Sequence, residues 1–417
     1  MENRYVAVVV GGAVSGSEAV FQLRENGIVV ICIEQNSLPY GKIEDGLPRW
    51  HVEQRKKEEE KIDERITHPL VHFVPHTKLG KDLSFEEIYK DWQVSAILLA
   101  NGAWRDRPLG IEGIDQFIEK GLVYQNPLVY WFNHYHEPGY RGTHYNIPDN
   151  TIVIGGGLAS MDVLKICQIE LTQKTLKARG IQVDMLKIEK EGIPKTLAAH
   201  GLSWLDLGLK GTSLFYRRRI EDMPLAEAPL NANPEEKTKA GALRRKILNN
   251  FQTKFLFNFF EQHLPQKAIL EKDRLVGLQF VKTQIANSQV KVIPDSETDV
   301  RSNLVISSIG SIPEPLPGLP QKGEYYDVQN QDTGEVKGFP FVFALGNAVT
   351  GKGNIRVSLL HGRQVAKHAI EQLKANPSRM CSSSKVEQIL SKVQKLQQKV
   401  GFEGDYKTWR DKQLAQR

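Results

Sequence analysis

Two segments of the chain share one pattern of apolar and glycine positions. An apolar run at residues 5–10 leads into Gly11-Gly-Ala-Val-Ser-Gly16, and a run at 151–154 leads into Gly155-Gly-Gly-Leu-Ala-Ser160. Strands that are apolar at every position, rather than at alternate positions, are typical of a parallel sheet covered on both faces. The pattern therefore predicts two βαβ nucleotide-binding units in one chain.

Further apolar runs extend both units. They predict strands at 28–33, 71–74, 94–99, 212–216, 254–259, 275–283, 303–308 and 341–344, a helix that begins at Ser84 and a helix over 358–373. Because the strand pattern resumes near residue 341, we expect the second unit to be inserted into the first. The predicted fold class is α/β with two Rossmann-like domains. The expected ranges are 1–115 and 313–374 for the first domain, 116–150 for an interdomain connection, 151–312 for the inserted domain and 375–417 for a helical tail.

The first glycine turn suits a dinucleotide that lacks a 2′-phosphate. Gly11 and Gly16 permit a tight strand-to-helix turn, whose backbone N–H groups receive a pyrophosphate. Glu34 ends the next strand, where an acid accepts hydrogen bonds from a ribose diol, and this predicts FAD or NAD rather than NADP. Ala13 stands where the second glycine of the motif belongs, which leaves open a tight turn that binds no nucleotide.

The second glycine turn is followed by basic rather than acidic side chains. Gly155, Gly157 and Ser160 give the pattern GxGxxS, and the next strand ends in Tyr216 followed by three arginines. Arginines at that strand end can bind the 2′-phosphate of NADP through charge-assisted hydrogen bonds. The alternative is a solvated surface cluster. Together, the two turns indicate FAD in the first unit and NADPH in the second.

Composition and charge exclude several classes of protein for this chain. The 417 residues include 40% hydrophobic residues, 55 Lys or Arg and 49 Asp or Glu, for a net charge of +6. This fits a globular protein rather than a disordered or collagen-like chain, and it argues only weakly for an acidic partner. We expect no nucleic-acid partner and no membrane span, since no apolar run reaches ~18 residues. Because the first strand begins almost at Met1, no cleavable leader fits, and we expect a cytoplasmic protein.

Cysteine and histidine spacing gives no evidence for a metal or a cluster. The chain has three cysteines: Cys32, Cys167 and Cys381. They form no CxxC pair and are too few for an iron–sulfur cluster, so redox chemistry would depend on an organic cofactor or an external partner. Three histidines recur at every fourth position: His68, His72 and His76. Pro69 and Pro75 forbid the helix that would align them, and we predict no metal site.

Beyond these patterns, residues 5–372 resemble, almost colinearly, the flavoprotein reductases that include adrenodoxin reductase and the glutamate synthase small subunit. The resemblance is carried by the two glycine turns and by residues 38–48, 77–80, 100–102, 216–224 and 343–363. The long crossover at 170–210 is more similar to adrenodoxin reductase. The chain departs from the family at Ala13 for glycine, Asn101 for threonine and Asn347 for Asp or Trp.

The resemblance implies which residues hold the cofactors. For FAD they are Gly11, Gly12, Ala13, Val14, Ser15, Gly16, Glu34, Gln35, Gly41, Lys42, Thr77, Ala100, Asn101, Gly102, Gly346, Asn347, Asn354 and Ile355. For NADP they are Gly155, Gly157, Leu158, Ala159, Ser160, Arg217 and Arg218. No catalytic acid or base is expected, because the cofactors carry the chemistry.

The function that the resemblance implies is transfer of hydride from NADPH to FAD, and then of single electrons to an external ferredoxin-type iron–sulfur protein. One alternative is an electron-input subunit resembling the glutamate synthase small subunit, although the cysteine-rich N-terminal region of that family is absent. A flavin monooxygenase is disfavoured, since no insertion resembles its own motif. An alternative of another class is a nucleotide-binding scaffold or redox sensor whose flavin site has decayed.

The charge excess lies entirely in the C-terminal tail. Residues 374–417 hold ten Lys or Arg and four Asp or Glu, so the remainder of the chain is formally neutral. Apolar residues at helical spacing predict an amphipathic helix: Val386, Ile389, Leu390, Val393, Leu396 and Val400. We favour packing of this stripe on the body over docking of an acidic carrier. The sequence leaves the oligomeric state open.

Overall fold

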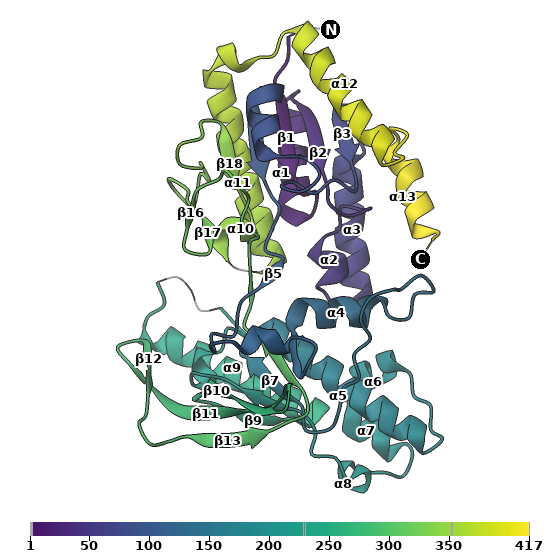
Figure 1. Cartoon of the computed structure of the whole chain (residues 1–417), viewed down its shortest axis with the longest axis vertical. Coiled ribbons are helices and arrows are strands. Elements are labelled where there is room, and N and C mark those ends of the chain that lie inside the picture. Colours follow the sequence, from purple (N-terminus) through teal and green to yellow (C-terminus); the bar gives the residue numbers. More distant parts are fainter. Residues whose placement is uncertain (1–2, 228, 230, 352, 417) are drawn as a thin grey trace. The chain divides into compact units, whose positions relative to one another are not determined.

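The computed structural model describes residues 3–227, 229, 231–351 and 353–416. The chain forms two compact units (Figure 1). Unit 1 comprises Met1–Arg105, His136–Tyr140 and Ser311–Arg417, and unit 2 comprises Asp106–Tyr135 and Arg141–Gly310. Most of unit 2 thus interrupts the sequence of unit 1, which agrees with the predicted insertion. Within the described residues, no helix has an apolar stretch long enough to cross a membrane.

Unit 1 is built on a five-stranded parallel sheet. Its strands, in spatial order, are β18 (Val342–Ala344), β4 (Ala96–Leu99), β1 (Val6–Val10), β2 (Val29–Ile33) and β3 (Val71–Val74). Every residue of β1 and β2 is buried. Alternate residues of β1 enter two separate apolar clusters, one on each face of the sheet. Burial on both faces explains why the apolar runs are continuous.

Helices cover both faces of this sheet. They are α1 (Val14–Glu25), α2 (Lys42–Asp45), α3 (Val52–Ile66), α10 (Asn347–Thr350), α11 (Ile355–Ala375), α12 (Ser383–Lys399) and α13 (Tyr406–Leu414). Short elements complete the unit: a π-helical turn at Glu87–Trp92, a 3-10 turn at Pro377–Arg379, and β16 (Gln321–Lys322) with β17 (Tyr325–Tyr326). Helices α1 and α11 pack closely, because Gly362 brings α11 against the backbone of Ser15.

The predicted tail is part of the core of unit 1. Val386 and Val393 of α12 join the apolar cluster on one face of the sheet, whereas Tyr406 and Trp409 of α13 join the cluster on the other. Figure 1 shows α12, in yellow, beside β3. The ring of Tyr406, at the start of α13, lies 5.1 Å from that of Phe73 in β3, measured between ring centres. The side chain of Gln397 donates to the Phe73 carbonyl, 2.8 Å away, and so covers a backbone group of this edge strand. The preferred packing role of the apolar stripe is therefore confirmed.

Unit 2 contains a second five-stranded parallel sheet. Its order is β6 (Leu122–Tyr124), β14 (Val305–Ser308), β7 (Ile152–Gly155), β8 (Ser213–Phe215) and β9 (Asn258–Phe260). The helices are α4 (Gln125–His134), α5 (Leu158–Ala178), α6 (Met185–Glu191), α7 (Ile193–Ala198), α8 (Trp204–Leu207) and α9 (Pro234–Phe255). Two 3-10 turns lie at Ile114–Phe117 and Ile220–Asp222.

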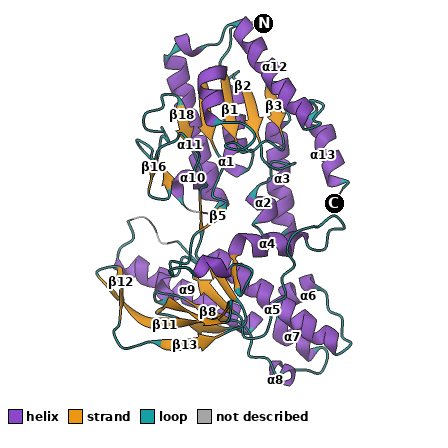
Figure 2. Cartoon of the chain, viewed as in Figure 1, coloured by secondary structure: helices purple, strands orange, loops and turns teal. Residues whose placement is uncertain are grey.

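An antiparallel layer accompanies this parallel sheet and appears as the lower orange strands of Figure 2. It consists of β10 (His263–Glu271), β11 (Arg274–Ala286), β12 (Gln289–Val292) and β13 (Thr298–Arg301). Two further short strands, β5 (Arg105–Asp106) and β15 (Ser311–Ile312), lie where the chain passes between the units. The layer supplies the turn between β11 and β12, which contacts the arginine cluster described below.

Three local expectations differ from the structure. The range 116–150, expected as a connection, contributes β6 and α4 to unit 2, because β6 pairs with β14. The strand expected at 254–259 begins only at Asn258: α9 continues to Phe255, whose carbonyl accepts a hydrogen bond from the buried Gln168 side chain. The helix expected from Ser84 does form, and the Ser84 hydroxyl accepts from the Glu87 N–H, but the helix is short and Glu87–Trp92 is a π-helical turn.

Candidate functional site

The first glycine turn follows β1 and leads into α1. Gly11 has a φ of +92°, and a Cβ there would lie 2.6 Å from the Ala100 carbonyl oxygen. A Cβ on Gly16 would lie only 1.8 Å from the Gly11 carbonyl oxygen. Contacts this short with backbone atoms cannot be relieved by a side-chain rotation, so both positions need glycine. The turn therefore brings the first N–H groups of α1 to the carboxyl end of β1, as a pyrophosphate site requires.

Ala13, the departure in this turn, is accommodated by a glycine from another segment. It occupies the N-cap of α1 with extended backbone. Gly41 lies against its methyl group, because a Cβ on Gly41 would be 2.8 Å from the Ala13 Cβ. Gly41 also has a φ of +52°, which suits glycine better than any other residue. Because Gly41 has no side chain, the Ala13 methyl has room beside it, and the turn forms without a clash.

Glu34 lies directly beside this turn. Its side chain is 4% exposed, and its Oε2 accepts from the Gly12 N–H at 2.9 Å while Oε1 accepts from the Asn36 N–H at 3.0 Å. Burial raises the pKa of Glu34 to about 7, although these backbone hydrogen bonds lower it. Each carboxylate oxygen keeps further acceptor capacity, so the group can also receive the hydroxyls of a ribose.

Other predicted FAD residues of unit 1 are already hydrogen-bonded. The buried Thr77 hydroxyl donates to the Pro75 carbonyl at 3.0 Å, and the Thr77 N–H donates to the Glu34 carbonyl at 2.8 Å. The Asn101 side chain pairs with the Tyr326 hydroxyl at 3.0 Å. Burial raises the pKa of Tyr326, so this hydroxyl stays neutral. Asn101 thus fixes the chain after β4. Gln35 follows β2, and Ala100 and Gly102 follow β4, with Ala100 buried in an apolar cluster of unit 1.

Residues in the C-terminal part of unit 1, within the 343–363 segment that carries the resemblance, contact the same glycine turn. A Cβ on Gly346 would lie 2.4 Å from the Ser15 hydroxyl oxygen. The Gly346 N–H donates to Nδ1 of the buried His361 at 2.8 Å, so Nδ1 is the acceptor nitrogen. Asn354 caps α11 by accepting from the Arg356 and Val357 N–H groups. Ile355, the first residue of α11, and the buried Val14 and Ser15 complete the predicted set near α1 and α11.

Unit 1 fits FAD on two observations. The glycine turn places the start of α1 beside Glu34, whose Oε2 accepts from the Gly12 N–H, and Oδ1 of Asn347 is buried with no hydrogen-bond partner among the described residues. A buried, unsatisfied acceptor costs free energy, and a flavin or its ribityl chain offers the donors to satisfy it. The predicted Lys42 contacts the Ser311 hydroxyl at 3.0 Å and lies 5.8 Å from the Trp104 ring centre.

The second glycine turn, in unit 2, follows β7 and leads into α5. A Cβ on Gly155 would lie 2.4 Å from the Ser308 carbonyl oxygen, and one on Gly156 would enter the ring of Tyr216. Gly157 differs, because the nearest atom to its Cβ position is the Pro224 Cγ at 3.8 Å. The first turn of α5 is open: Leu158 is 55% exposed and Ala159 is exposed, whereas Ser160 is buried and donates to the Gly157 carbonyl. An exposed helix N-terminus of this kind suits a pyrophosphate.

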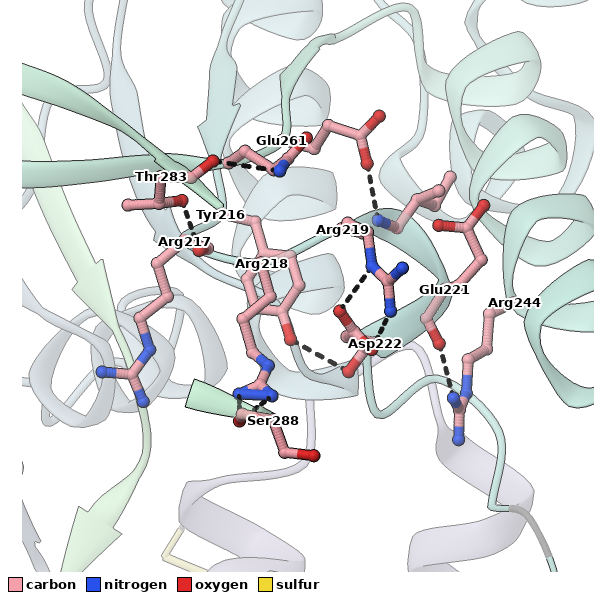
Figure 3. A network of polar contacts seen from close by, with 12 residues as sticks. Tyr216, Arg217, Arg218, Arg219, Glu221, Asp222, Arg244, Glu261, Thr283 and Ser288 are labelled. Carbon is pink, nitrogen blue, oxygen red and sulfur yellow. Dashed lines mark hydrogen bonds and ion pairs between the residues drawn. The ribbon is translucent and has the colours of Figure 1, made fainter. Parts of the chain in front are cut away.

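Three arginines follow β8 and have different partners (Figure 3). Arg219 makes a two-point ion pair with Asp222. Arg218 donates from both terminal nitrogens to the Ser288 carbonyl, at 2.8 and 3.3 Å, in the β11–β12 turn. Arg217 is exposed, and Figure 3 shows its guanidinium without a partner among the residues drawn. Arg217 and Arg218 therefore remain the arginines that can receive a phosphate without breaking an ion pair.

The chain is similar in sequence to curated proteins named as reductases or oxidoreductases. No family model matches it. It is 23% identical over 332 residues to the NADPH-Fe(3+) oxidoreductase subunit beta of Geobacter sulfurreducens, over 75% of this chain and 38% of that protein. It is 26% identical over 165 residues to the probable mitochondrial NADPH:adrenodoxin oxidoreductase of Schizosaccharomyces pombe, over 39% of this chain and 34% of that protein. The chain thus spans less than two fifths of the length of these relatives.

Structure comparison gives a nearly complete match. The Mycobacterium tuberculosis FprA structure in complex with NADPH superposes with a TM-score of 0.73 at 18% identity, over 95% of this chain and 91% of that one. The resemblance to flavoprotein reductases of the adrenodoxin reductase type is confirmed. The fold predicted for this type, α/β with two Rossmann-like domains, is confirmed as well.

Beside the first glycine turn lies an ion cluster that the sequence motifs did not reveal. Glu18 of α1 is almost fully buried, and its two oxygens lie 2.7 Å from Arg65 of α3 and 2.7 Å from Arg363 of α11. A buried carboxylate needs such partners, because removing it from water unpaired is costly. The triad fixes α3 and α11 to the helix whose N-terminus would face the pyrophosphate. The sequence signal for this cluster is weak: Glu18 is an acid in the first half of α1, next to the apolar Ala19 and Val20.

Proposed function

We propose that the chain is an NADPH oxidoreductase that binds FAD in unit 1 and NADPH in unit 2, and passes electrons to an external ferredoxin-type iron–sulfur protein. The observation that carries the proposal is the contrast at the two glycine turns. The strand beside the first ends in Glu34, whereas the strand beside the second ends in Arg217 and Arg218. When bound, FAD supplies two-electron uptake from NADPH and one-electron release, which suits an iron–sulfur carrier.

Each unit would bind one of the two cofactors through its own residues. In unit 1, the N–H groups at the start of α1 would hold the pyrophosphate, Glu34 the ribose hydroxyls and Asn347 a polar atom of the flavin half. In unit 2, the start of α5 would hold the second pyrophosphate, and Arg217 and Arg218 the 2′-phosphate. A carboxylate repels a 2′-phosphate and guanidinium groups attract it, so the two sites would not exchange their ligands.

Colour and nucleotide preference test the proposal. The purified protein should be yellow, or turn yellow with added FAD, and anaerobic NADPH should bleach it faster than NADH. The double variant Arg217→Ala/Arg218→Ala should lose about 10- to 100-fold of its preference for NADPH, measured as the ratio of bleaching rates. Arg301→Ala, which removes an exposed arginine paired with Glu271, is the matched control and should keep the ratio.

Two outcomes would contradict specific parts of this proposal. A colourless protein that takes up no FAD would refute the oxidoreductase and leave the nucleotide-binding scaffold with a decayed flavin site. A wild-type protein that bleaches equally fast with NADH would refute the role of Arg217 and Arg218 while leaving the flavin in place.

The electron acceptor is tested separately. Ferredoxin-type proteins with [2Fe–2S] or [4Fe–4S] clusters should be reduced in stopped-flow experiments with NADPH in excess. We propose that the reaction takes place in the cytoplasm, as the sequence analysis predicts.

The second candidate is an electron-input subunit. It is favoured by the Geobacter sulfurreducens relative, which is named as a subunit and is much longer than the matched region. Under this reading, the isolated chain would bleach with NADPH but reduce none of the isolated iron–sulfur proteins. Rapid reduction of any of them by the chain alone would favour the free-standing reductase.

A further inference from the structure

The C-terminal helix α13 contacts the loop that carries the predicted adenosine site. The loop, residues 34–41, begins at Glu34 and ends at Gly41. The indole N–H of Trp409 donates to the Ser37 carbonyl at 2.8 Å, and Trp409 is only 8% exposed. The Trp409 ring also meets the edge of His76, with 5.9 Å between ring centres. His76 in turn donates its backbone N–H to the Asn36 carbonyl.

A second set of contacts converges on Asp63 of α3. The Tyr40 hydroxyl donates to its two oxygens at 3.0 and 3.2 Å, and the Tyr406 hydroxyl donates to Oδ1 at 2.5 Å. Arg410 of α13 completes the set, 3.1 Å from Oδ2. Tyr40 is 1% exposed and Tyr406 is 5% exposed. Burial and the Asp63 charge raise the pKa of both tyrosines, so both hydroxyls stay protonated and act as donors.

Both sets of contacts reach residues of the predicted FAD site. Tyr40 immediately precedes Gly41, which lies against Ala13 in the glycine turn. The Asn36 N–H donates to the Glu34 carboxylate, and its neighbour Ser37 is the residue that Trp409 holds. The loop is therefore fixed on one side by the glycine turn and on the other by α13. Apolar packing alone would attach α13 to the sheet, but the Trp409 hydrogen bond ends on the loop itself, and the Tyr406 hydrogen bond ends on Asp63, which also accepts from Tyr40 of the loop.

We propose that α13 is a positioning element for the adenosine half of FAD. Trp409 and Tyr406 hold the 34–41 loop in the form that presents Glu34 to the ribose and keeps Gly41 against the pyrophosphate turn. The inference rests on the proposed binding of FAD in unit 1. A loop that is ordered before the ligand arrives loses less conformational entropy on binding, which tightens affinity.

FAD affinity of the full-length apoprotein tests the idea. The variants are Trp409→Phe, Tyr406→Phe and the pair, which keep the rings and remove the donors. Loss of one or two buried hydrogen bonds should raise the Kd for FAD about tenfold or more in the pair, measured by quenching of flavin fluorescence. The Kd for NADP, which would bind unit 2, should stay at the wild-type value.

A control variant separates positioning from general destabilisation. Val393→Ala removes apolar contacts of α12 on the other face of the sheet and should lower the Tm without changing the Kd for FAD. Backbone amides of residues 36–41 should exchange hydrogen faster in the Trp409→Phe apoprotein than in wild type, and this readout serves even if the double variant folds poorly.

Three results decide between the explanations. A wild-type Kd in the double variant, or an equal loss in Val393→Ala, would overturn the positioning role. Failure of the wild-type protein to bind FAD would instead refute the proposed function. A raised Kd in the double variant alone, with faster exchange in the loop, would support α13 as a positioning element.

Discussion

The two glycine turns of this chain are built alike but tolerate different changes. In both, the first glycine lies against a backbone carbonyl, of Ala100 in unit 1 and of Ser308 in unit 2. The third motif position differs, since Ala13 fills it in unit 1, whereas in unit 2 a Cβ on Gly157 would make only an ordinary contact, 3.8 Å from the Pro224 Cγ. The final position differs as well, because unit 2 has Ser160 where unit 1 has Gly16. The same kind of turn can thus require glycine at its final position, as in unit 1, or have room for a methyl group at its third position, as in unit 2.

The largest expected difference comes from adding a methyl group at Gly16 and, for comparison, at Gly157. Gly16→Ala places a methyl 1.8 Å from a backbone oxygen and should lower the free energy of unfolding by about 3 kcal/mol or more, with loss of bound FAD. Gly157→Ala should keep the Tm within a few degrees but weaken NADPH binding, because its methyl would face the pyrophosphate. Calorimetry and nucleotide titration measure both. Equal Tm losses in the two variants would contradict the comparison.

An intermediate effect is expected at Glu34, the acid that distinguishes unit 1 from unit 2. Its folded pKa of about 7 lies above the ordinary value of 4.5, so the folded apoprotein holds a proton that the unfolded chain has released. Glu34 therefore favours folding below about pH 4.5, and this contribution is lost as the pH rises through 7. Ribose hydroxyls need the ionised carboxylate, so FAD should bind about tenfold more weakly at pH 6 than at pH 8.

Glu34→Gln provides the matched control for this pH dependence. The variant should bind FAD more weakly than wild type at pH 8 and show a flat affinity between pH 6 and 8. Titrations across this range measure both. The Asp45 charge also raises the pKa of Glu34. Burial raises the pKa of the nearby Cys32 thiol, so this thiol stays neutral throughout. A persistent slope in Glu34→Gln would assign the pH dependence to another group.

The smallest effect is expected at Ala13. Because Gly41 already accommodates the methyl, Ala13→Gly should change the Kd for FAD by less than about fivefold and slightly lower the Tm through the freedom of the added glycine. Gly41→Ala should do much more, since it meets the Ala13 methyl in a backbone conformation that disfavours alanine. If Ala13→Gly strengthened FAD binding a hundredfold, the methyl would be an obstacle to the pyrophosphate rather than a matched contact.

The sequence predicted the sheets well and some boundaries poorly. Continuous apolar runs identified β1, β2, β4 and β7. Strands that are buried on both faces are apolar at every position, so they stand out in the sequence. The strand expected at 254–259 was shifted, since its phenylalanines are spaced every second residue while Phe255 still ends α9 and Phe260 is 40% exposed. Local pattern cannot tell a helix end from a strand start when both are aromatic.

The roles of individual FAD and NADP residues stay predictions, although the structure brings many of them together. Gly11, Gly16 and Glu34 meet at one strand end, as their spacing implied. Arg217 and Arg218 follow β8, but the tie from Arg218 to Ser288 depends on an antiparallel layer that the sequence did not place beside them. Thr77 lies in contact with Glu34 through its backbone, while its hydroxyl is engaged elsewhere.

By itself, the sequence determined the fold class, the insertion of one unit into the other and the contrast between the acid and the arginines. Each of these can be recognised from short local patterns along the chain. Only the tertiary structure decided what lies around those residues. Asp63 joins Tyr40 to Tyr406, and Glu18 joins Arg65 to Arg363, across hundreds of positions. Such pairs have no fixed spacing, because the packing of helices on the sheet, rather than any local period, brings them within hydrogen-bonding distance.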